Sequence, residues 1–117
     1  MTSPLATELK TYKGQNRVLL VFAPSVKDKG YVEQKRLLAA AEDGLRERDM
    51  VVLELLGGEH AEALRSDLKV SNDLFVVVLI GKDGGEKERF LEPVEPTQLF
   101  SLIDRMPMRR REMQERG

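Results

Sequence analysis

The side chains best placed for chemistry come just after the apolar run Arg17 to Phe22. This continuous run predicts a strand buried on both faces of a sheet, and ligands of such sheets bind just beyond the carboxyl ends of the strands. The polar side chains that follow the run are Ser25, Lys27, Asp28, Tyr31 and Gln34. We expect Asp28 to begin a helix, whose free N–H groups favour anions. The sequence therefore predicts a ligand loop, in which Ser25 binds a ligand oxygen and Lys27 pairs with its charge.

The same loop also has a purely structural interpretation, in which Ser25 and Asp28 only cap the helix. Capping residues are expected at a helix start whatever the function, so this interpretation is the simpler of the two. A role for Ser25 as a nucleophile has less support. The one histidine, His60, lies far along the chain just after Gly57-Gly58, and the chain contains no Gly-x-Ser-x-Gly turn.

A second candidate is a set of arginines in the last third of the chain, because arginine forks suit phosphate, sulfate and carboxylate groups. Its members are Arg89, Arg105, Arg109, Arg110 and Arg111. Sulfated glycans and lipid head groups fit this chemistry. Nucleic acid is not expected, because no aromatic residue lies among the arginines. The alternative is a solvated helix end, since Glu112 and Glu115 offset the charge.

Composition removes several other chemistries. The chain has no cysteine, which excludes thiol catalysis, disulfides, cysteine metal sites and iron–sulfur clusters in it. Acidic residues are many, but no EF-hand or His-x-x-x-His spacing appears, so we predict neither a metal nor a cofactor. Asp104 is expected to pair with Arg109 or Arg89 in a buried network that is structural rather than catalytic.

The overall composition indicates one domain of ordinary globular type. The chain has 117 residues, of which 41% are hydrophobic and 33% are charged, and its formal net charge is −1. Bulk charge therefore does not favour polyanions, and such binding needs a local patch. No apolar run has the length of a membrane span, and no basic segment followed by an apolar core begins the chain. We expect neither a membrane span nor a signal peptide in it.

Apolar periodicity and turn residues predict the elements that must position these side chains. A short helix is expected within residues 1–16, from Thr2 to Gly14, capped by Ser3. The elements expected after it are a strand at 17–22, a long helix from Asp28 to about Arg48 with a weak point at Gly44, a strand at 50–56, a helix at 59–68, strands at 74–80 and 86–91 joined by a turn at 82–85, a helix from Pro96 to Pro107, and a basic tail at 108–117. The strand–helix–strand unit predicts a parallel pair, and residues 1–117 are expected to form a single domain.

This order of elements resembles the thioredoxin fold, a three-layer α/β architecture with βαβ and ββα units around a four-stranded mixed sheet. In that fold the first strand is central, beside the second strand on one side and the third on the other. The resemblance places the loop after Phe22 where thioredoxins and peroxiredoxins carry their reactive cysteine, and Val21-Phe22-Ala23-Pro24 is similar to the strand exit of peroxiredoxins. No cysteine follows, and Ser71-Asn72-Asp73 stands where redox thioredoxins have a cis-proline. Thiol redox chemistry is therefore excluded.

A more specific resemblance covers nearly the whole chain. Its motifs are Gly14-Gln15-Asn16-Arg17, Gln34, Lys82-Asp83-Gly84 followed by Lys87-Glu88-Arg89-Phe90, and the run from Leu99 to Arg110 followed by Glu112. Together these motifs resemble the P-DUDES domain, a cysteine-independent, peroxiredoxin-like domain of unknown biochemical activity. That domain occurs as single-domain bacterial proteins and in secreted vertebrate matrix proteins such as Equarin and the sushi-repeat proteins. The resemblance implies an exported setting, extracellular or periplasmic, and supplies no catalytic residue.

Three functions are compatible with these residues. The first is a non-redox, thioredoxin-like interaction module with an unknown protein partner, favoured because the chain has neither a cysteine nor a nucleophile–base pair. The second is the binding of a polyanion, such as a sulfated glycan, through the C-terminal arginines. The third is a non-thiol enzyme that uses the loop after the first strand. It has the least support, so we expect the chain not to be an enzyme.

Overall fold

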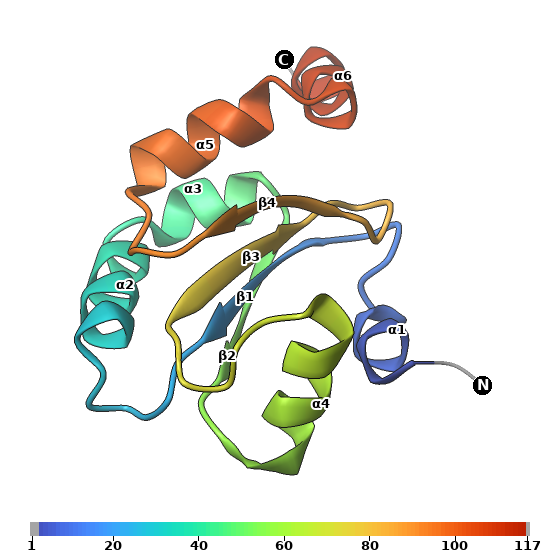
Figure 1. Cartoon of the computed structure of the whole chain (residues 1–117). Coiled ribbons are helices and arrows are strands. Elements are labelled where there is room, and N and C mark those ends of the chain that lie inside the picture. The colour runs from blue at the N-terminus through green and yellow to red at the C-terminus, as the bar shows by residue number, and fades with distance from the viewer. Residues whose placement is uncertain (1–2, 117) are drawn as a thin grey trace.

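A four-stranded mixed sheet lies at the centre of the fold, with helices on both of its faces (Figure 1). The computed structural model describes residues 3–116. The strands, in their order across the sheet, are β2 (Met50–Leu55), β1 (Arg17–Phe22), β3 (Val76–Ile80) and β4 (Glu86–Phe90). β1 is parallel to β2 and antiparallel to β3, and β3 is antiparallel to β4. The predicted α/β architecture and the central place of the first strand are therefore confirmed.

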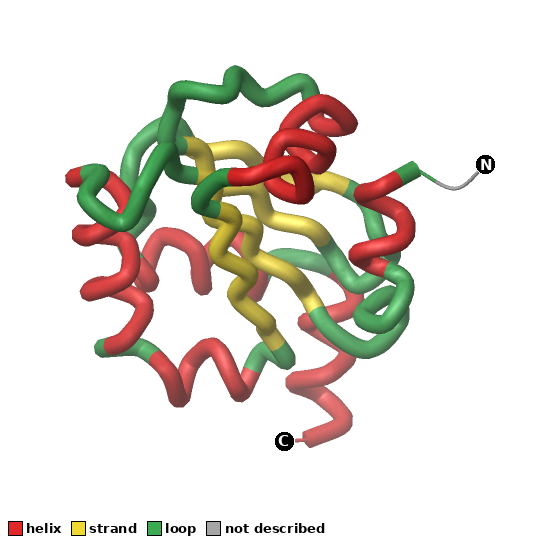
Figure 2. The backbone as a smooth tube through the Cα atoms, turned by 90° about the horizontal axis from the view of Figure 1, so that it is seen from below, coloured by secondary structure: helices red, strands yellow, loops and turns green. Residues whose placement is uncertain are grey.

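The two faces of the sheet carry separate apolar layers, because successive strand residues point to opposite sides. The helices are α1 (Pro4–Leu9), α2 (Lys29–Ala39), α3 (Glu42–Glu47), α4 (Gly58–Leu68), α5 (Pro96–Asp104) and α6 (Pro107–Arg116). Val18, Leu20 and Phe22 of β1 pack with residues of α1 and α4. Leu19 and Val21 pack with residues of α2, α3 and α5 on the other face. Figure 2 shows the strands between these helices, which explains why β1 is apolar from Val18 to Phe22.

The long helix expected from Asp28 to about Arg48 is wrong, because α2 and α3 are separate helices. The chain leaves helical geometry after α2, and Ala41 has φ −127° and ψ 26°. Alanine favours helix, so the sequence carries no local signal for this break. The break gives α3 a direction of its own, in which it packs on β2 and α5.

The position of α3 depends on Gly44, which lies against the ring of Phe100 on α5. A Cβ atom at Gly44 would lie 2.4 Å from Cε2 of Phe100, so a larger residue requires movement. The Arg48 guanidinium lies over the same ring, with its Cζ atom 4.1 Å from the ring centroid. Gly44, which the sequence marks as a weak point of one long helix, instead permits the close approach of two helices.

Two element boundaries also differ clearly from the expected ones. β3 begins at Val76 instead of Leu74, because the Leu74 carbonyl oxygen accepts a hydrogen bond from the Arg65 side chain. α1 ends at Leu9, and the residues after it form turns instead of a helix that reaches Gly14. Thr2, the expected start of that helix, lies outside the described residues. Beyond Pro107 the basic tail is helical, as α6.

The β3–β4 hairpin is confirmed, and Gly84 at its turn has φ +86°, a value that favours glycine. Within residues 3–116, no helix combines the length and the apolar character needed to cross a lipid bilayer.

Candidate functional site

The loop that follows β1 uses its polar side chains to shape its own backbone. The Ser25 hydroxyl accepts a hydrogen bond from the Lys27 amide at 3.2 Å. The Asp28 carboxylate caps α2 by accepting from the Tyr31 amide at 3.0 Å. Both contacts are those of the capping interpretation, and they satisfy N–H groups that a bound anion would otherwise need.

Gln34 and Tyr31 point from α2 into the fold. The Gln34 side chain is fully buried, where its Nε2 donates to the Val94 carbonyl at 3.0 Å and its Oε1 accepts from the Val94 amide at 2.8 Å. The Tyr31 hydroxyl accepts from Lys35 Nζ at 3.3 Å, and the rest of the ring belongs to the core. Gln34 therefore joins α2 to the segment that leads into α5, and the structure does not gather the five loop residues around one cavity.

The loop before β3 is held by Arg65 of α4, a residue that the sequence does not single out. Its guanidinium donates to the carbonyl oxygens of Ser71 and Leu74, the second at 2.9 Å, and lies 5.1 Å from the centroid of the Phe22 ring. Arg65 is only 3% exposed, and burial lowers the pKa of its guanidinium. The loop that stands in place of a cis-proline turn is thus fixed by one buried cation.

Three large apolar side chains are exposed at this same end of the sheet. Val26 follows β1, Leu74 precedes β3 and Leu91 follows β4, and their exposed fractions are 58%, 51% and 68%. The three segments adjoin the sheet at the same end of its strands, since Phe22 pairs with Val76 and Val77 pairs with Phe90. Each of these side chains offers apolar surface that a partner protein could cover.

The candidate arginines do not form one group. Arg89 on β4 donates to the Leu68 carbonyl at 2.7 Å and pairs with Glu86, so it fastens the end of α4 to the edge strand. Arg105, Arg110 and Arg111 have exposed side chains at the α5–α6 junction and on α6. Arg109, between them, is only 2% exposed and points inward.

Arg109 belongs to a dense set of charges at the other end of the sheet, where β1 and β2 begin. We call this set the ionic cluster; its members are Arg17, Glu47, Arg48, Asp49, Lys82, Asp104, Arg109, Glu112 and Arg116. Asp104 accepts from Arg109 Nε at 3.0 Å and from Arg48 Nη2 at 2.8 Å. The predicted pairing of Asp104 with Arg109 is therefore confirmed, and the alternative pairing with Arg89 is not observed.

The most buried member of the ionic cluster is Arg17, which is 1% exposed at the start of β1. Its Nη1 and Nη2 atoms donate to the two carboxylate oxygens of Glu112 on α6, at 3.2 and 3.3 Å. Lys82 Nζ donates to the same carboxylate at 2.5 Å and to Asp49 at 2.9 Å. One carboxylate of α6 thus binds the first strand and the β3–β4 hairpin together.

Three carboxylates of the ionic cluster, those of Glu112, Asp104 and Asp49, are held in their charged form. Burial alone would raise the pKa of Glu112, but hydrogen bonds from Lys82 and Arg17 outweigh it and the pKa is lowered. Burial would also raise the pKa of Asp104, but hydrogen bonds from Arg48 and Arg109 outweigh it and the pKa is lowered. Burial would raise the pKa of Asp49 too, but hydrogen bonds from Lys82 and Arg116 outweigh it and the pKa is lowered. These three carboxylates are therefore charged at neutral pH.

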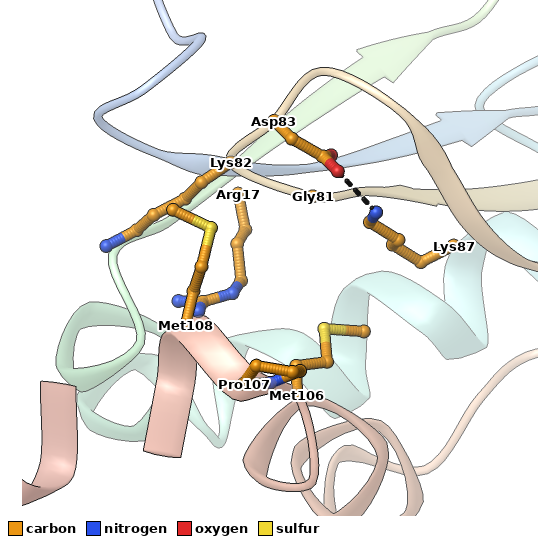
Figure 3. A pocket seen from close by; sticks show the side chains of 8 residues that line it. All are labelled: Arg17, Gly81, Lys82, Asp83, Lys87, Met106, Pro107 and Met108. Atoms are coloured by element: carbon orange, nitrogen blue, oxygen red, sulfur yellow. Dashed lines mark hydrogen bonds and ion pairs between the residues drawn. The ribbon is translucent and has the colours of Figure 1, made fainter. Parts of the chain in front are cut away.

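A cavity of about 370 Å³ lies beside the ionic cluster, between the hairpin turn and the α5–α6 junction (Figure 3). Its lining residues are Arg17, Gly81, Lys82, Asp83, Lys87, Met106, Pro107 and Met108. None of the side chains predicted as site residues lines it. Within residues 3–116, no group of three or more histidine, aspartate or glutamate side chains is arranged to hold a metal ion.

Comparison with known proteins identifies the family of the chain. Residues 8–112 match the family described as Domain of unknown function (DUF4174), and the chain belongs to this family. It is 32% identical to the sushi repeat-containing protein SRPX of Homo sapiens over 123 residues, which cover 92% of this chain and 26% of that protein. It is 31% identical to SRPX2 of Bos taurus, over 82% of this chain and 24% of that protein. The resemblance to the P-DUDES domain is thereby confirmed.

Solved structures confirm the fold. Thioredoxin O2 of Arabidopsis thaliana superposes with a TM-score of 0.64 at 13% identity, covering 91% of this chain and 90% of that one. The 2-Cys peroxiredoxin of Plasmodium vivax superposes with a TM-score of 0.58 at 16% identity, covering 93% and 85%. The chain shares the fold of these proteins and lacks the cysteine that thiol chemistry requires. It spans about a quarter of the length of the sushi-repeat relatives.

Proposed function

We propose that this chain is a non-redox interaction module, which binds a protein partner at the end of the sheet where β1 ends. The observation that supports it is a contrast at that end. Ser25, Asp28 and Gln34 use their polar groups within the chain. Val26 and Leu74, by comparison, expose more than half of their surface to solvent. The surface offers apolar area to a partner and no activated group to a substrate.

The rigidity of this surface also favours a binding role. Leu74 lies on the loop that Arg65 fixes through two carbonyl oxygens, and Phe75 beside it packs against Gly30 of α2. A surface that is ordered before binding loses little conformational entropy on association. The partner contact is therefore expected to depend on apolar side chains and hardly at all on Ser25.

The sushi repeat-containing relatives are longer than this chain, which supports the proposal of a module within larger proteins. The chain covers about a quarter of the sushi repeat-containing relatives, in which the domain stands beside other parts of the same polypeptide. We infer an extracellular or periplasmic setting for this chain as well, in line with the resemblance to secreted matrix proteins. A contact surface without a thiol suits such a setting, because it works in either redox state.

Peptide selection tests this proposal without a known partner. A displayed library of random peptides is panned on the wild-type chain, and the enriched peptides are measured against Leu74→Asp, Val26→Asp and, as a matched control on α6, Met113→Asp. We expect at least about a tenfold loss of affinity for the first two variants, because a charge in an apolar contact remains desolvated, and no change for the control. Failure to enrich any peptide, or equal binding to all variants, contradicts the proposal. Ser25→Ala is expected to leave the selected binding intact, which separates this function from an enzyme at the same loop.

The exposed arginines favour a second candidate function, the binding of a sulfated glycan. Arg105, Arg110 and Arg111 stay exposed while Arg109 is held inside the ionic cluster. The test is retention on heparin as salt is raised, for the wild type, for Arg110→Ser/Arg111→Ser, and for the control Arg36→Ser/Arg46→Ser. Retention that falls with salt and is lost only in the first variant supports this candidate. Retention that survives the loss of Arg110 and Arg111 contradicts it.

A further inference from the structure

The cavity between the hairpin and the α5–α6 junction is not used by the proposed interaction surface, which lies at the opposite end of the sheet. Its volume of about 370 Å³ falls within the range of small-molecule sites, about 300–1,000 Å³. Met106, Pro107 and Met108 form one wall, and the aliphatic chain of Lys87, which lies close against Gly81, forms another. Thioether and aliphatic groups of this kind suit an apolar ligand of adaptable shape.

A hydrogen-bond donor without a partner faces this apolar space. Arg17 is 1% exposed, and its contacts with Glu112 and the Arg48 carbonyl use only the two terminal nitrogens. Nε takes part in none of the hydrogen bonds within residues 3–116. The described structure leaves no fully buried side-chain nitrogen unpaired, so this Nε retains access to the cavity that Arg17 lines. In Figure 3, Nε lies on the side of the guanidinium toward Met106 and Lys87, and the terminal nitrogens lie on the other side.

The side of the Arg17 guanidinium that carries Nε, which we call its free edge, indicates which ligand chemistry fits the cavity. Nε and the remaining hydrogen of Nη2 form the side of the guanidinium that binds a carboxylate with two parallel hydrogen bonds. The lining carries three cations, Arg17, Lys82 and Lys87, and one carboxylate, Asp83. Glu112 and Asp49 pair with Arg17 and Lys82 from outside the lining, so Lys87 is the cation whose charge is available to a ligand. Lys87 Nζ is 2.7 Å from Asp83, and both side chains are partly exposed, so Lys87 can turn toward a second anion at small cost.

We propose that this cavity is a binding site for a small monocarboxylate with a short apolar body. The carboxylate binds to the free edge of Arg17, and the ammonium of Lys87 adds a second positive charge. The apolar body lies on Met106, Pro107 and Met108. Glu112 keeps the Arg17 guanidinium in place, so the ionic cluster serves as the rigid floor of the site.

The proposal is tested by titrating the isotope-labelled full chain with hexanoate, hexan-1-ol and acetate, with amide and methionine-methyl shifts as the signal. Hexanoate is expected to shift the resonances of residues 81–87 and 106–108. Hexan-1-ol lacks the charge and acetate lacks the apolar body, so each should bind at least about tenfold more weakly than hexanoate. Equal affinity for hexan-1-ol and hexanoate, or no shift at these residues with hexanoate, overturns the proposal.

Two kinds of variant locate the site. Met108→Trp is expected to fill the cavity and weaken hexanoate binding about tenfold, and Met113→Trp, five residues further along the same helix, is the matched control that should bind as the wild type does. Lys87→Met removes one charge from a partly exposed position, so this variant should fold even if Met108→Trp perturbs α6. We expect it to weaken hexanoate binding about tenfold and to leave hexan-1-ol binding unchanged. Hexanoate affinity that stays at the wild-type value in Lys87→Met or in a folded Met108→Trp overturns the proposal.

Discussion

The two ends of the central sheet are stabilised by different kinds of interaction. Where β1 ends, the polar side chains make short local contacts such as that of Ser25 with the Lys27 amide, and apolar side chains such as Leu74 face solvent. Where β1 begins, charged side chains from distant parts of the sequence meet, and Arg17 and Glu112 are 95 residues apart. The first end is shaped by local hydrogen bonds, whereas the second is held together by long-range ion pairs.

This difference separates two kinds of signal in the sequence. The thioredoxin resemblance points to the loop after β1, but the most specific motif of the chain, Leu99 to Arg110 with Glu112, contributes to the ionic cluster at the other end. α6 consists mainly of charged residues and has no continuous apolar face, so ion pairs are the main contacts that dock it. The residues of the motif therefore form the ion pairs that attach α6 to the rest of the fold. Substitutions at the two ends of the sheet are expected to differ in their effect on stability.

The largest effect is expected from Glu112→Ala. The change leaves Arg17 charged, buried and without its carboxylate partner, and breaking a buried pair in this way costs about 3 kcal/mol or more of the free energy of unfolding. Urea unfolding measures the loss. Glu115→Ala, at an exposed position of the same helix, is the control and should stay within about 0.5 kcal/mol of the wild type. A Glu112→Ala variant as stable as this control would show that the ionic cluster does not hold α6.

Acid should weaken the same end. The pKa values of Asp49, Asp104 and Glu112 are lowered in the folded chain from ordinary values of 3.8, 3.8 and 4.5. A carboxylate with a lowered folded pKa stabilises the fold above its unfolded pKa, and this stabilisation disappears as pH falls through the folded pKa. We therefore expect the free energy of unfolding to be steady above about pH 5 and to fall below about pH 4.

Unfolding measured from pH 7 to pH 2 checks this dependence. Glu112→Ala should show a shallower loss than the wild type, since one of the three carboxylates is already gone, and the two curves should approach each other in acid. Parallel curves over the whole range would mean that Glu112 does not titrate with a lowered pKa. Added salt screens exposed pairs such as Asp83 with Lys87, so these pairs contribute little to the measured pH dependence of stability.

At the end of β1, the side chain that should matter most is Gln34. Gln34→Leu removes two buried hydrogen bonds and leaves the amide and carbonyl of Val94 unpaired, which should lower the free energy of unfolding by about 2 kcal/mol. Gln98→Leu, at an exposed position of α5, is the control. If both variants unfold at the same urea concentration, the contact between α2 and the segment before α5 is dispensable.

The smallest effect is expected from Ser25→Ala. The hydroxyl makes one exposed contact with a neighbouring amide, so its loss should change the free energy of unfolding by less than about 0.5 kcal/mol. Thermal unfolding is the measurement, with Asp28→Ala for comparison, because loss of a helix cap costs about 1 kcal/mol. A Ser25→Ala variant less stable than Asp28→Ala would reverse the order that the contacts at this loop imply.

Local sequence patterns predict the strands, the hairpin and the class of fold. The apolar run from Val18 to Phe22 indicates a strand covered on both faces, and the turn at residues 82–85 indicates the hairpin, because these signals depend only on neighbouring residues. The capping role of Asp28 was open to prediction for the same reason. The resemblance of the motifs then supplied the family, which the match over residues 8–112 confirms.

Which side chains meet across the fold depends on how the elements pack together. The break between α2 and α3 lets Gly44 pack closely against Phe100, and no residue near Ala40 predicts it. Arg17 looks like the polar end of a strand and Glu112 like a charge on a tail, yet they form a buried pair. Long-range pairing of this kind depends on the distances between elements once they are packed, and a linear pattern of charges does not contain those distances.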